Sequence, residues 1–229
     1  DISSKQLQEL IRKDELVKTE FHRAESRLRL LEEMKATDEG FTQSVRKLLQ
    51  DAKTNASLSG NILGVVAQLI KVPKQYEVAI EMALGASVQN IVTKNEDNAK
   101  VLVEYLKNKQ YGRATFLPIS SMKPRALTKE QETYLKEAGV LGVANQLVQY
   151  PSNVQSVVAS LLGSTVIVDT MDHAISLARK SKYSFKIVTL EGDILNPQGS
   201  LTGGSAKQTT SSLISRDREI RELKPKIPL

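Results

Sequence analysis

The stretch that decides the fold is GVVAQLIKVP at residues 64–73, because the sequence repeats it as GVANQLVQYP at residues 142–151. The same shift of 78 residues, from Gly64 to Gly142, also places Leu-Gly at 84–85 over Leu-Gly at 162–163. Two copies at this spacing indicate a duplication within the chain and not a solenoid. We therefore expect two related lobes.

The repeat continues through the rest of each half. Each copy is expected to contain a short strand, a helix, a strand, a helix and a strand. This alternation predicts an α/β architecture, in the broader sense a mixture of helices and small sheets. A polar helix near residues 129–138 joins the two lobes. The corresponding later segments are 89–94 with 165–170, 97–106 with 172–179, and 113–117 with 186–190.

Heptad spacing of apolar residues marks both ends of the chain. A helix of this length is marginal without a partner face, so we expect the two ends to pair as an antiparallel coiled coil. The alternative for the N-terminal helix is an amphipathic helix lying on the domain. The prolines in residues 224–229 break helical geometry. The heptad positions are Leu7, Leu10, Val17, Phe21, Ala24, Leu28 and Leu31, and then Leu213, Ile220, Leu223 and Ile227.

The composition sets limits on the class of protein. With 229 residues, 40% of them hydrophobic, the chain can bury a substantial core. It contains no cysteine, which excludes disulfides, thiolate zinc sites and cysteine nucleophiles. No apolar run approaches the length of a membrane span. The chain opens on Asp1 with no signal-like segment, so we expect a piece of a longer cytoplasmic protein; its formal charge of +6 permits an anionic partner.

A glycine-rich loop, LNPQGSLTGGS at residues 195–205, follows the strand expected at 187–190. A phosphate-binding P-loop needs G-x-x-x-x-G-K-[ST], and a dinucleotide fingerprint needs G-x-G-x-x-G at the start of a helix. Neither spacing occurs, because Lys207 comes too late and a Ser/Thr/Gln-rich segment follows. The remaining interpretations are a close contact with another backbone and a simple turn that leaves the sheet.

Several motifs, in this order along the chain, resemble the hinge of a bacterial structural-maintenance-of-chromosomes (SMC) protein. They lie between the two heptad segments and together span most of the sequence. Their combination is far more specific than any single glycine pattern. The motifs are Gly40-Phe41 followed by Val45-Arg46, GVVAQLI at 64–70 with Val72-Pro73, ASVQNIV at 86–92, GRATFLP at 112–118, TLEGD at 189–193 and PQGSLTGG at 197–204.

The resemblance implies a two-lobed hinge that homodimerises and joins two long antiparallel coiled-coil arms. It also implies an ABC-type ATPase head at the far end of the arms, where kleisin and accessory subunits would bind, and a chromosome-associated protein with no cofactor in this region. The expected divisions are a coiled-coil helix at 1–39, a helix and linker at 40–59, lobe 1 at 60–139, lobe 2 at 140–206 and the returning helix at 207–229.

The resemblance also gives the glycine loop a role at the seam of the dimer. A sheet edge is a template for pairing with another chain, and glycine permits close backbone approach. In the hinges that this sequence resembles, each lobe meets the opposite lobe of its partner. The expected interface residues are Arg113, Ala114, Thr115, Phe116 and Leu117 in one lobe and Gly199, Ser200, Leu201, Gly203 and Gly204 in the other.

Two basic stretches without acidic residues predict weak, sequence-independent DNA binding through phosphate contacts. The alternative is a solvated charged face. Interleaved aromatic residues, Tyr105, Tyr111, Tyr183 and Phe185, either stack on unpaired bases or pack in the core. No base-reading motif accompanies them. The candidate DNA-binding residues are Lys107, Lys109, Arg113, Lys123, Arg125, Arg179, Lys180, Lys182 and Lys186.

Catalysis finds little support in the sequence. His22 and His173 are isolated, which argues against a metal site or a catalytic triad. The acids at 96–97 and Asp172 suit helix starts better than acid/base chemistry. A hypothesis from another class stays open: a duplicated α/β enzyme domain that binds a phosphate-bearing ligand at residues 199–204.

Overall fold

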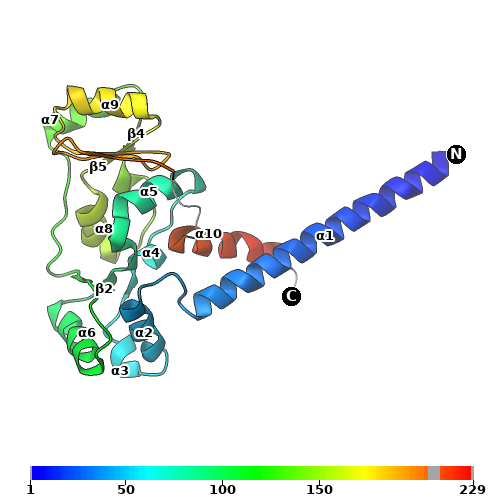
Figure 1. The fold of residues 1–229 in the computed structure, drawn as a ribbon, viewed down its shortest axis with the longest axis horizontal. Coiled ribbons are helices and arrows are strands. Elements are labelled where there is room, and N and C mark those ends of the chain that lie inside the picture. The colour runs from blue at the N-terminus through cyan, green and yellow to red at the C-terminus, as the bar shows by residue number, and fades with distance from the viewer. Residues whose placement is uncertain (1, 206–211, 228–229) are drawn as a thin grey trace.

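The computed structural model describes residues 2–205 and 212–227. A body of short helices and small sheets lies at one end, and one long helix projects from it (Figure 1). This helix, α1, covers 35 residues, about 50 Å at 1.5 Å per residue. The chain returns along it in the shorter helix α10. The bounds are α1, Ile2–Ala36; α10, Leu213–Leu223; and a final 3-10 turn η6, Lys224–Lys226.

The expected order of elements is present in both copies of the repeat. The shift of 78 residues carries the helical turn that starts at Lys74 onto the one that starts at Ser152. In the first copy the elements are β1, Gly64–Val65; α4, Val66–Leu69; η1, Lys74–Tyr76; α5, Glu77–Leu84; η2, Gly85–Gln89; β2, Ile91–Thr93; α6, Glu96–Lys109; and β3, Phe116–Pro118. In the second they are β4, Val140–Val143; η4, Ala144–Gln146; η5, Ser152–Val154; α8, Gln155–Leu162; β5, Thr165–Val168; α9, Met171–Lys180; and β6, Lys186–Thr189.

Each copy builds the same three-stranded core sheet. The first strand pairs antiparallel with the second, which pairs parallel with the third. The second copy then adds a hairpin, so its sheet has the order β4-β5-β6-β7-β8 while the first stops at β1-β2-β3. Gly192, with φ +92°, occupies the turn between β6 and β7, where glycine adopts positive φ without strain. The added strands are β7, Ile194–Leu195, and β8, Leu201–Thr202.

A reciprocal backbone bridge joins the two copies. The Lys71 amide donates to the Gln149 carbonyl at 2.8 Å, and the Gln149 amide donates to the Lys71 carbonyl at 2.9 Å. Lys71 and Gln149 are equivalent positions in the repeat. The bridge is therefore symmetric, because each of the two residues donates its amide to the carbonyl of the other. The bridge itself therefore has local two-fold symmetry with respect to the repeat.

The helices and sheets of the body are stacked in layers, with apolar cores between them. In Figure 1, α9 covers one face of the larger sheet, α5 and α8 lie between the sheets, and α6 and α2 lie beyond β2. The central layer holds a core shared by both lobes, in which Val92 of β2 and Ile167 of β5 meet residues of α5 and α8. Two further cores lie under α9 and under α6.

The connecting segments belong to these cores more than the expected boundaries suggest. Phe41, Val45 and Leu48 are buried against β1 and α6, so the packing of lobe 1 begins before residue 60. Leu127 packs in the core under α9, so the end of the connection belongs to lobe 2. The boundary at residue 206 lies outside the described residues. The connecting elements are α2, Gln43–Ala52; α3, Ala56–Ser59; α7, Lys129–Glu132; and η3, Thr133–Lys136.

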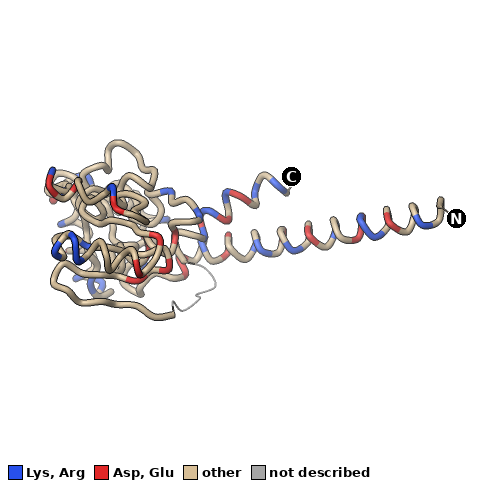
Figure 2. Tube along the Cα trace, turned by 90° about the horizontal axis from the view of Figure 1, so that it is seen from above, with Lys and Arg blue, Asp and Glu red and all other residues tan. Residues whose placement is uncertain are grey.

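The two terminal helices run in opposite directions and pair only close to the body (Figures 1 and 2). Leu31 is fully buried, whereas Leu7, Leu10 and Val17 are 58%, 63% and 64% exposed. The antiparallel arrangement is confirmed, but the expected heptad of the returning helix ends early. Ile227 lies beyond α10, because the chain turns into η6 at Pro225. No helix in the described part of the chain has the length and apolar character of a membrane span.

Candidate dimer interface

Strand β8 forms one exposed edge of the larger sheet. Leu201 pairs with Leu195 and Thr202 with Ile194 on one side, while no described strand pairs on the other. Leu201 is 52% exposed, which is high for a leucine in a strand. An exposed edge with an apolar side chain is a surface on which another strand can pair.

The three glycines around β8 play different roles. Gly199 and Gly204 have φ of +95° and +136°, and an added Cβ on either would meet nothing within 4 Å. Gly203 does not have positive φ; a Cβ there would lie 2.5 Å from the Asp193 carboxylate. That carboxylate accepts a hydrogen bond from the Thr189 hydroxyl at 3.1 Å. Gly203 is therefore needed inside its own lobe, whereas Gly199 and Gly204 leave open space.

Strand β3 forms an edge of the smaller sheet, and its hydrogen bonds show which groups are free. The Thr115 carbonyl accepts from the Ile91 amide at 3.1 Å, and the Ile119 amide donates to the Thr93 carbonyl at 2.9 Å. Backbone groups alternate in direction along a strand, so those of Phe116 point away from β2. Pro118 also lies on this outer side but has no N–H to donate.

The expected interface residues of lobe 1 surround a groove beside this edge. The groove has a volume of about 410 Å³, and its lining includes Lys107, Arg113, Ala114 and Phe116. Arg113 and Thr115 are exposed, and Ala114 and Phe116 are half-buried. Leu117 differs, because its side chain is 7% exposed and packs in the shared core. Only its backbone is placed near the edge.

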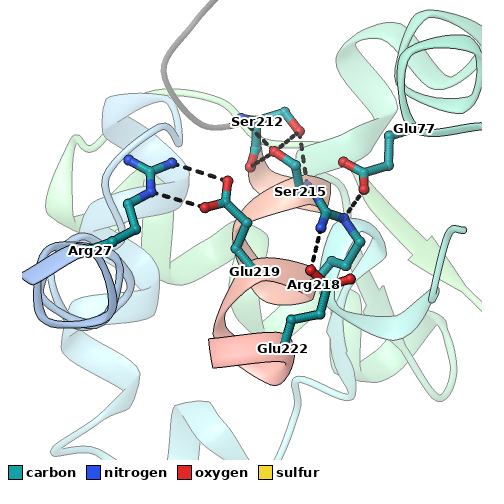
Figure 3. A network of polar contacts seen from close by, with 7 residues as sticks. All are labelled: Arg27, Glu77, Ser212, Ser215, Arg218, Glu219 and Glu222. Atoms are coloured by element: carbon teal, nitrogen blue, oxygen red, sulfur yellow. Dashed lines mark hydrogen bonds and ion pairs between the residues drawn. The ribbon is translucent and has the colours of Figure 1, made fainter. Parts of the chain in front are cut away.

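Ion pairs hold helix α10 to lobe 1 through an arginine of α10 and to α1 through a glutamate of α10 (Figure 3). Arg218 pairs with Glu77 of α5 and, at 2.8 Å, with Glu222. On the other side, Glu219 accepts two hydrogen bonds from Arg27 of α1 at 2.9 and 3.0 Å. Burial alone would lower the pKa of Arg218, but hydrogen bonds to Glu77 and Glu222 and their charges outweigh it and raise that pKa.

Basic side chains also hold the C-terminal end of α1, where unpaired carbonyl groups favour cations. Lys53 donates to the Ala36 carbonyl, Arg46 to the Thr37 carbonyl at 2.9 Å, and Arg216 to the Glu39 carbonyl at 2.6 Å. Arg216 is only 3% exposed, and this burial lowers its pKa. Sequence reasoning missed this cluster, because Arg46 lies in α2, Lys53 directly after it and Arg216 in α10, and the three share no local pattern.

The candidate DNA-binding residues fall into two groups. Lys180 is paired with Glu137 at 2.6 Å, and Lys186 donates to the Ala83 carbonyl at 3.0 Å, so these two already have partners. The others lie at the C-terminal ends of α6 and α9 and in the connecting segment, and no ion pair engages them within the described residues. These others are Lys107, Lys109, Arg113, Lys123, Arg125, Arg179 and Lys182.

The interleaved aromatic residues are occupied within the chain. The hydroxyls of Tyr105 and Tyr111 both bind the Asp51 carboxylate, at 2.6 and 2.7 Å. Phe185 is 3% exposed, and Tyr183 packs against the core under α9. These contacts favour the packing interpretation over stacking on bases.

His173 is not isolated as the sequence suggested. Its Nδ1 lies 2.7 Å from the carboxylate of Asp169, just before the start of α9, and this hydrogen bond lowers the pKa of Asp169. A Cβ at Gly139 would lie 2.3 Å from both groups, so only glycine fits beside the pair. No group of three or more potential metal ligands occurs among residues 2–205 and 212–227.

Comparisons with known proteins agree with this geometry. The "Chromosome partition protein Smc" of Bacillus subtilis is 41% identical over 87% of this chain, and that of Desulfitobacterium hafniense is 41% identical over 96%. The chain spans only 17% and 18% of the length of these two relatives.

Solved structures of hinge domains share the fold. The SMC hinge domain of Geobacillus stearothermophilus, crystallised as an asymmetric dimer, is 37% identical with a TM-score of 0.81, covering 93% of this chain and 84% of that one. The Pyrococcus furiosus hinge domain is 30% identical with a TM-score of 0.55, covering 76% and 96%. The family of the flexible hinge domain of SMC proteins matches residues 58–178, and the chain belongs to this family.

Proposed function

We propose that this chain is the homodimerisation hinge of a chromosome-organising SMC ATPase and that it joins two long coiled-coil arms. The chromosome-partition relatives and the dimeric hinge structure support this proposal. In it, the ATPase head, kleisin and accessory subunits act at the far end of the arms, outside this chain. The protein would work in the cytoplasm on the chromosome, and the hinge would need no cofactor.

The observation that carries the proposal is a difference between the two copies of the repeat. In lobe 2, strand β7 covers the outer edge of β6. In lobe 1 the equivalent strand, β3, has no such neighbour among the described strands. Strand β8 of a second copy would fill this place, and a two-fold axis would make the contact twice. The result is one continuous sheet across each seam.

Dimerisation is tested with Leu201→Asp, which puts a charge on the exposed face of β8. Leu201 is already about half buried, so completing its burial contributes about 1 kcal/mol at each seam. Its loss at both seams should weaken dimerisation about thirtyfold, and the buried charge should weaken it further. Sedimentation equilibrium measures the dissociation constant. We choose this position over Gly203, because a side chain at Gly203 would also disturb Asp193 within the lobe.

The matched control is Leu141→Asp on β4, the opposite edge of the same sheet. Leu141 is 37% exposed, so the same charge is introduced on a comparable strand away from the seam. This variant should remain dimeric. A dimer of unchanged affinity in Leu201→Asp, or equal weakening in both variants, would remove β8 from the interface.

A second proposed function is weak, sequence-independent DNA contact. It is favoured by the unpaired basic residues at the ends of α6 and α9, which bind phosphates through release of counterions. Changing Arg179 and Lys182 to Glu should weaken binding to DNA and reduce its salt dependence, as measured by mobility shifts across a salt series. Lys100→Glu, near the start of α6, is the control. Identical salt slopes in all three proteins would exclude this surface.

The alternative of a duplicated enzyme with a ligand at residues 199–204 is not supported. Those residues form edge strand β8 and the turns on either side of it, in a chain whose residues 58–178 match the hinge family. The chain is a structural domain without a catalytic site of its own.

A further inference from the structure

A polar groove lies between the connecting segment and lobe 2, and Pro197, in the turn between β7 and β8, forms part of its lining. Its volume is about 410 Å³, within the range of small-ligand sites. No aspartate or glutamate of the described chain lines it. The polar residues that line it are Arg125, Gln131, Ser164, Thr165, Ser184 and Lys186.

The sequence builds this groove through one glycine. The Arg125 amide donates to the Ala159 carbonyl at 3.3 Å, so the connecting segment crosses the end of α8. A Cβ at Gly163 would lie 1.9 Å from the Arg125 carbonyl oxygen, which is an impossible contact. Gly163 therefore lets the segment lie against the helix end and brings Arg125 to the groove.

Lys186 supplies the second cation. It is the first residue of β6, directly opposite Thr165 of β5, and its side chain is half-buried. Its Nζ donates to the Ala83 carbonyl at 3.0 Å, and no carboxylate of the described chain pairs with it. Burial lowers its pKa. The ammonium group keeps two further N–H donors, and an anion beside it would favour the charged form.

Three hydroxyls complete the set of donors. Those of Ser164, Thr165 and Ser184 make no hydrogen bond within the described residues, so they are free to bind a ligand. The Gln131 amide donates to the Ser184 carbonyl at 3.1 Å, which fixes one wall of the groove. A guanidinium, an ammonium and several hydroxyls suit an anion with many oxygens.

We propose that this groove binds a single phosphate group, with Arg125 and Lys186 providing the charge and the three hydroxyls completing the shell of hydrogen bonds. The phosphate belongs either to a free phosphomonoester or to a nucleic-acid strand. The site is a defined pocket and does not depend on the exposed lysines of α6 and α9. It also differs from the glycine loop at 199–204 and implies no catalysis.

The test is a titration of the whole chain with inorganic phosphate at constant ionic strength, followed by the NMR shifts of backbone amides. We expect saturable shifts at Ser164, Thr165 and Lys186. Arg125→Ala and Lys186→Met should each weaken binding about tenfold or more, because each removes a charged hydrogen-bond donor. Lys100→Met removes an exposed lysine of α6 that does not line the groove and should bind as the unmodified chain does.

Arg125 is exposed, so its substitution leaves the fold intact even if the buried part of Lys186 proves essential. Unsaturable shifts, or equal affinity of Arg125→Ala and the unmodified chain, would overturn the proposal. Adenosine monophosphate and an oligothymidylate without terminal phosphates separate the two sources. Binding of the oligonucleotide alone, with no response to phosphate or the nucleotide, would also refute a single-phosphate site.

Discussion

Asp51 holds two tyrosine hydroxyls at once, at 2.6 Å from Tyr105 and 2.7 Å from Tyr111. The two rings meet edge to face, and Lys47 lies 5.1 Å from the centre of the Tyr111 ring. These hydrogen bonds lower the pKa of Asp51 and raise the pKa of Tyr105 to about 12. One carboxylate thereby ties α2, which supports the end of α1, to lobe 1.

Replacing Asp51 with Asn should lower the melting temperature by a few degrees at pH 7, because charge-assisted hydrogen bonds become neutral ones. The pKa of Asp51 is lower in the folded than in the unfolded chain, so its stabilisation is present above the unfolded pKa. It is lost as the pH falls through the folded value. The difference between the two proteins should therefore shrink below about pH 4.

Thermal unfolding followed by circular dichroism between pH 2 and 8 measures this difference. Glu20→Gln, on the exposed half of α1, is the control and should follow the unmodified chain at every pH. A difference for Asp51→Asn that is constant across the range would show that the carboxylate's charge is not the cause.

At the scale of elements, two ion pairs hold α10 in place, one of them buried and the other more exposed. The side chains of Arg218 and Glu77 are 14% and 9% exposed, whereas those of Arg27 and Glu219 are 34% and 25% exposed. Breaking a buried pair leaves a charge without a partner, which costs far more than losing an exposed pair. The contact with α5 should therefore hold α10 more firmly than the pair with α1.

Arg218→Ala should reduce the free energy of unfolding by about 3 kcal/mol or more, since Glu77 stays buried and charged. Arg27→Ala should cost about 1 kcal/mol or less. Urea unfolding gives both values. Adding Glu77→Gln to Arg218→Ala removes the unpaired charge and should recover part of the loss. A double variant no more stable than Arg218→Ala would show that the buried charge is not responsible.

The elements themselves were largely predictable, and their contacts were not. The repeat gave the order of strands and helices, because periodicity and turn residues are local signals. Phe41 and Val45 are buried in the core of lobe 1 by residues of β1 and α6, which are distant in the sequence. No local pattern therefore predicts their burial. The same holds for Arg218 and Glu77, which lie 141 residues apart. At the candidate interface, sequence reasoning named both segments but could not separate Gly203, restricted by Asp193, from Gly199 and Gly204.

At the scale of the whole molecule, α1 consists of an exposed N-terminal part and a packed C-terminal part. Residues 2–20 are exposed on every side, and their charges of both signs alternate along the helix in Figure 2. The part near the body packs against α10. Hydrogen bonds from Arg46, Lys53 and Arg216 hold its C-terminal end. An unpartnered helix of this length is marginal in water.

Hydrogen exchange should therefore show a gradient along α1. Amides of residues 2–20 should exchange orders of magnitude faster than those of residues 27–36, whose protection should match that of α10. Mass spectrometry of peptides from this helix measures the rates. Equal protection along the whole of α1 in a dilute sample would mean that the outer half has a partner of its own.

The route of α10 has a mechanical consequence. The chain leaves the last strand of lobe 2 and returns to lobe 1, where Arg218 meets Glu77, and α1 ends beside the same lobe. Tension along an arm would therefore act first on lobe 1. Lobe 2 would experience it only through the core that the two lobes share. With the proposed seam, that load crosses to the second subunit through strands of two and three residues, β8 and β3. Each proposed seam would therefore rest on only a few backbone hydrogen bonds between strands.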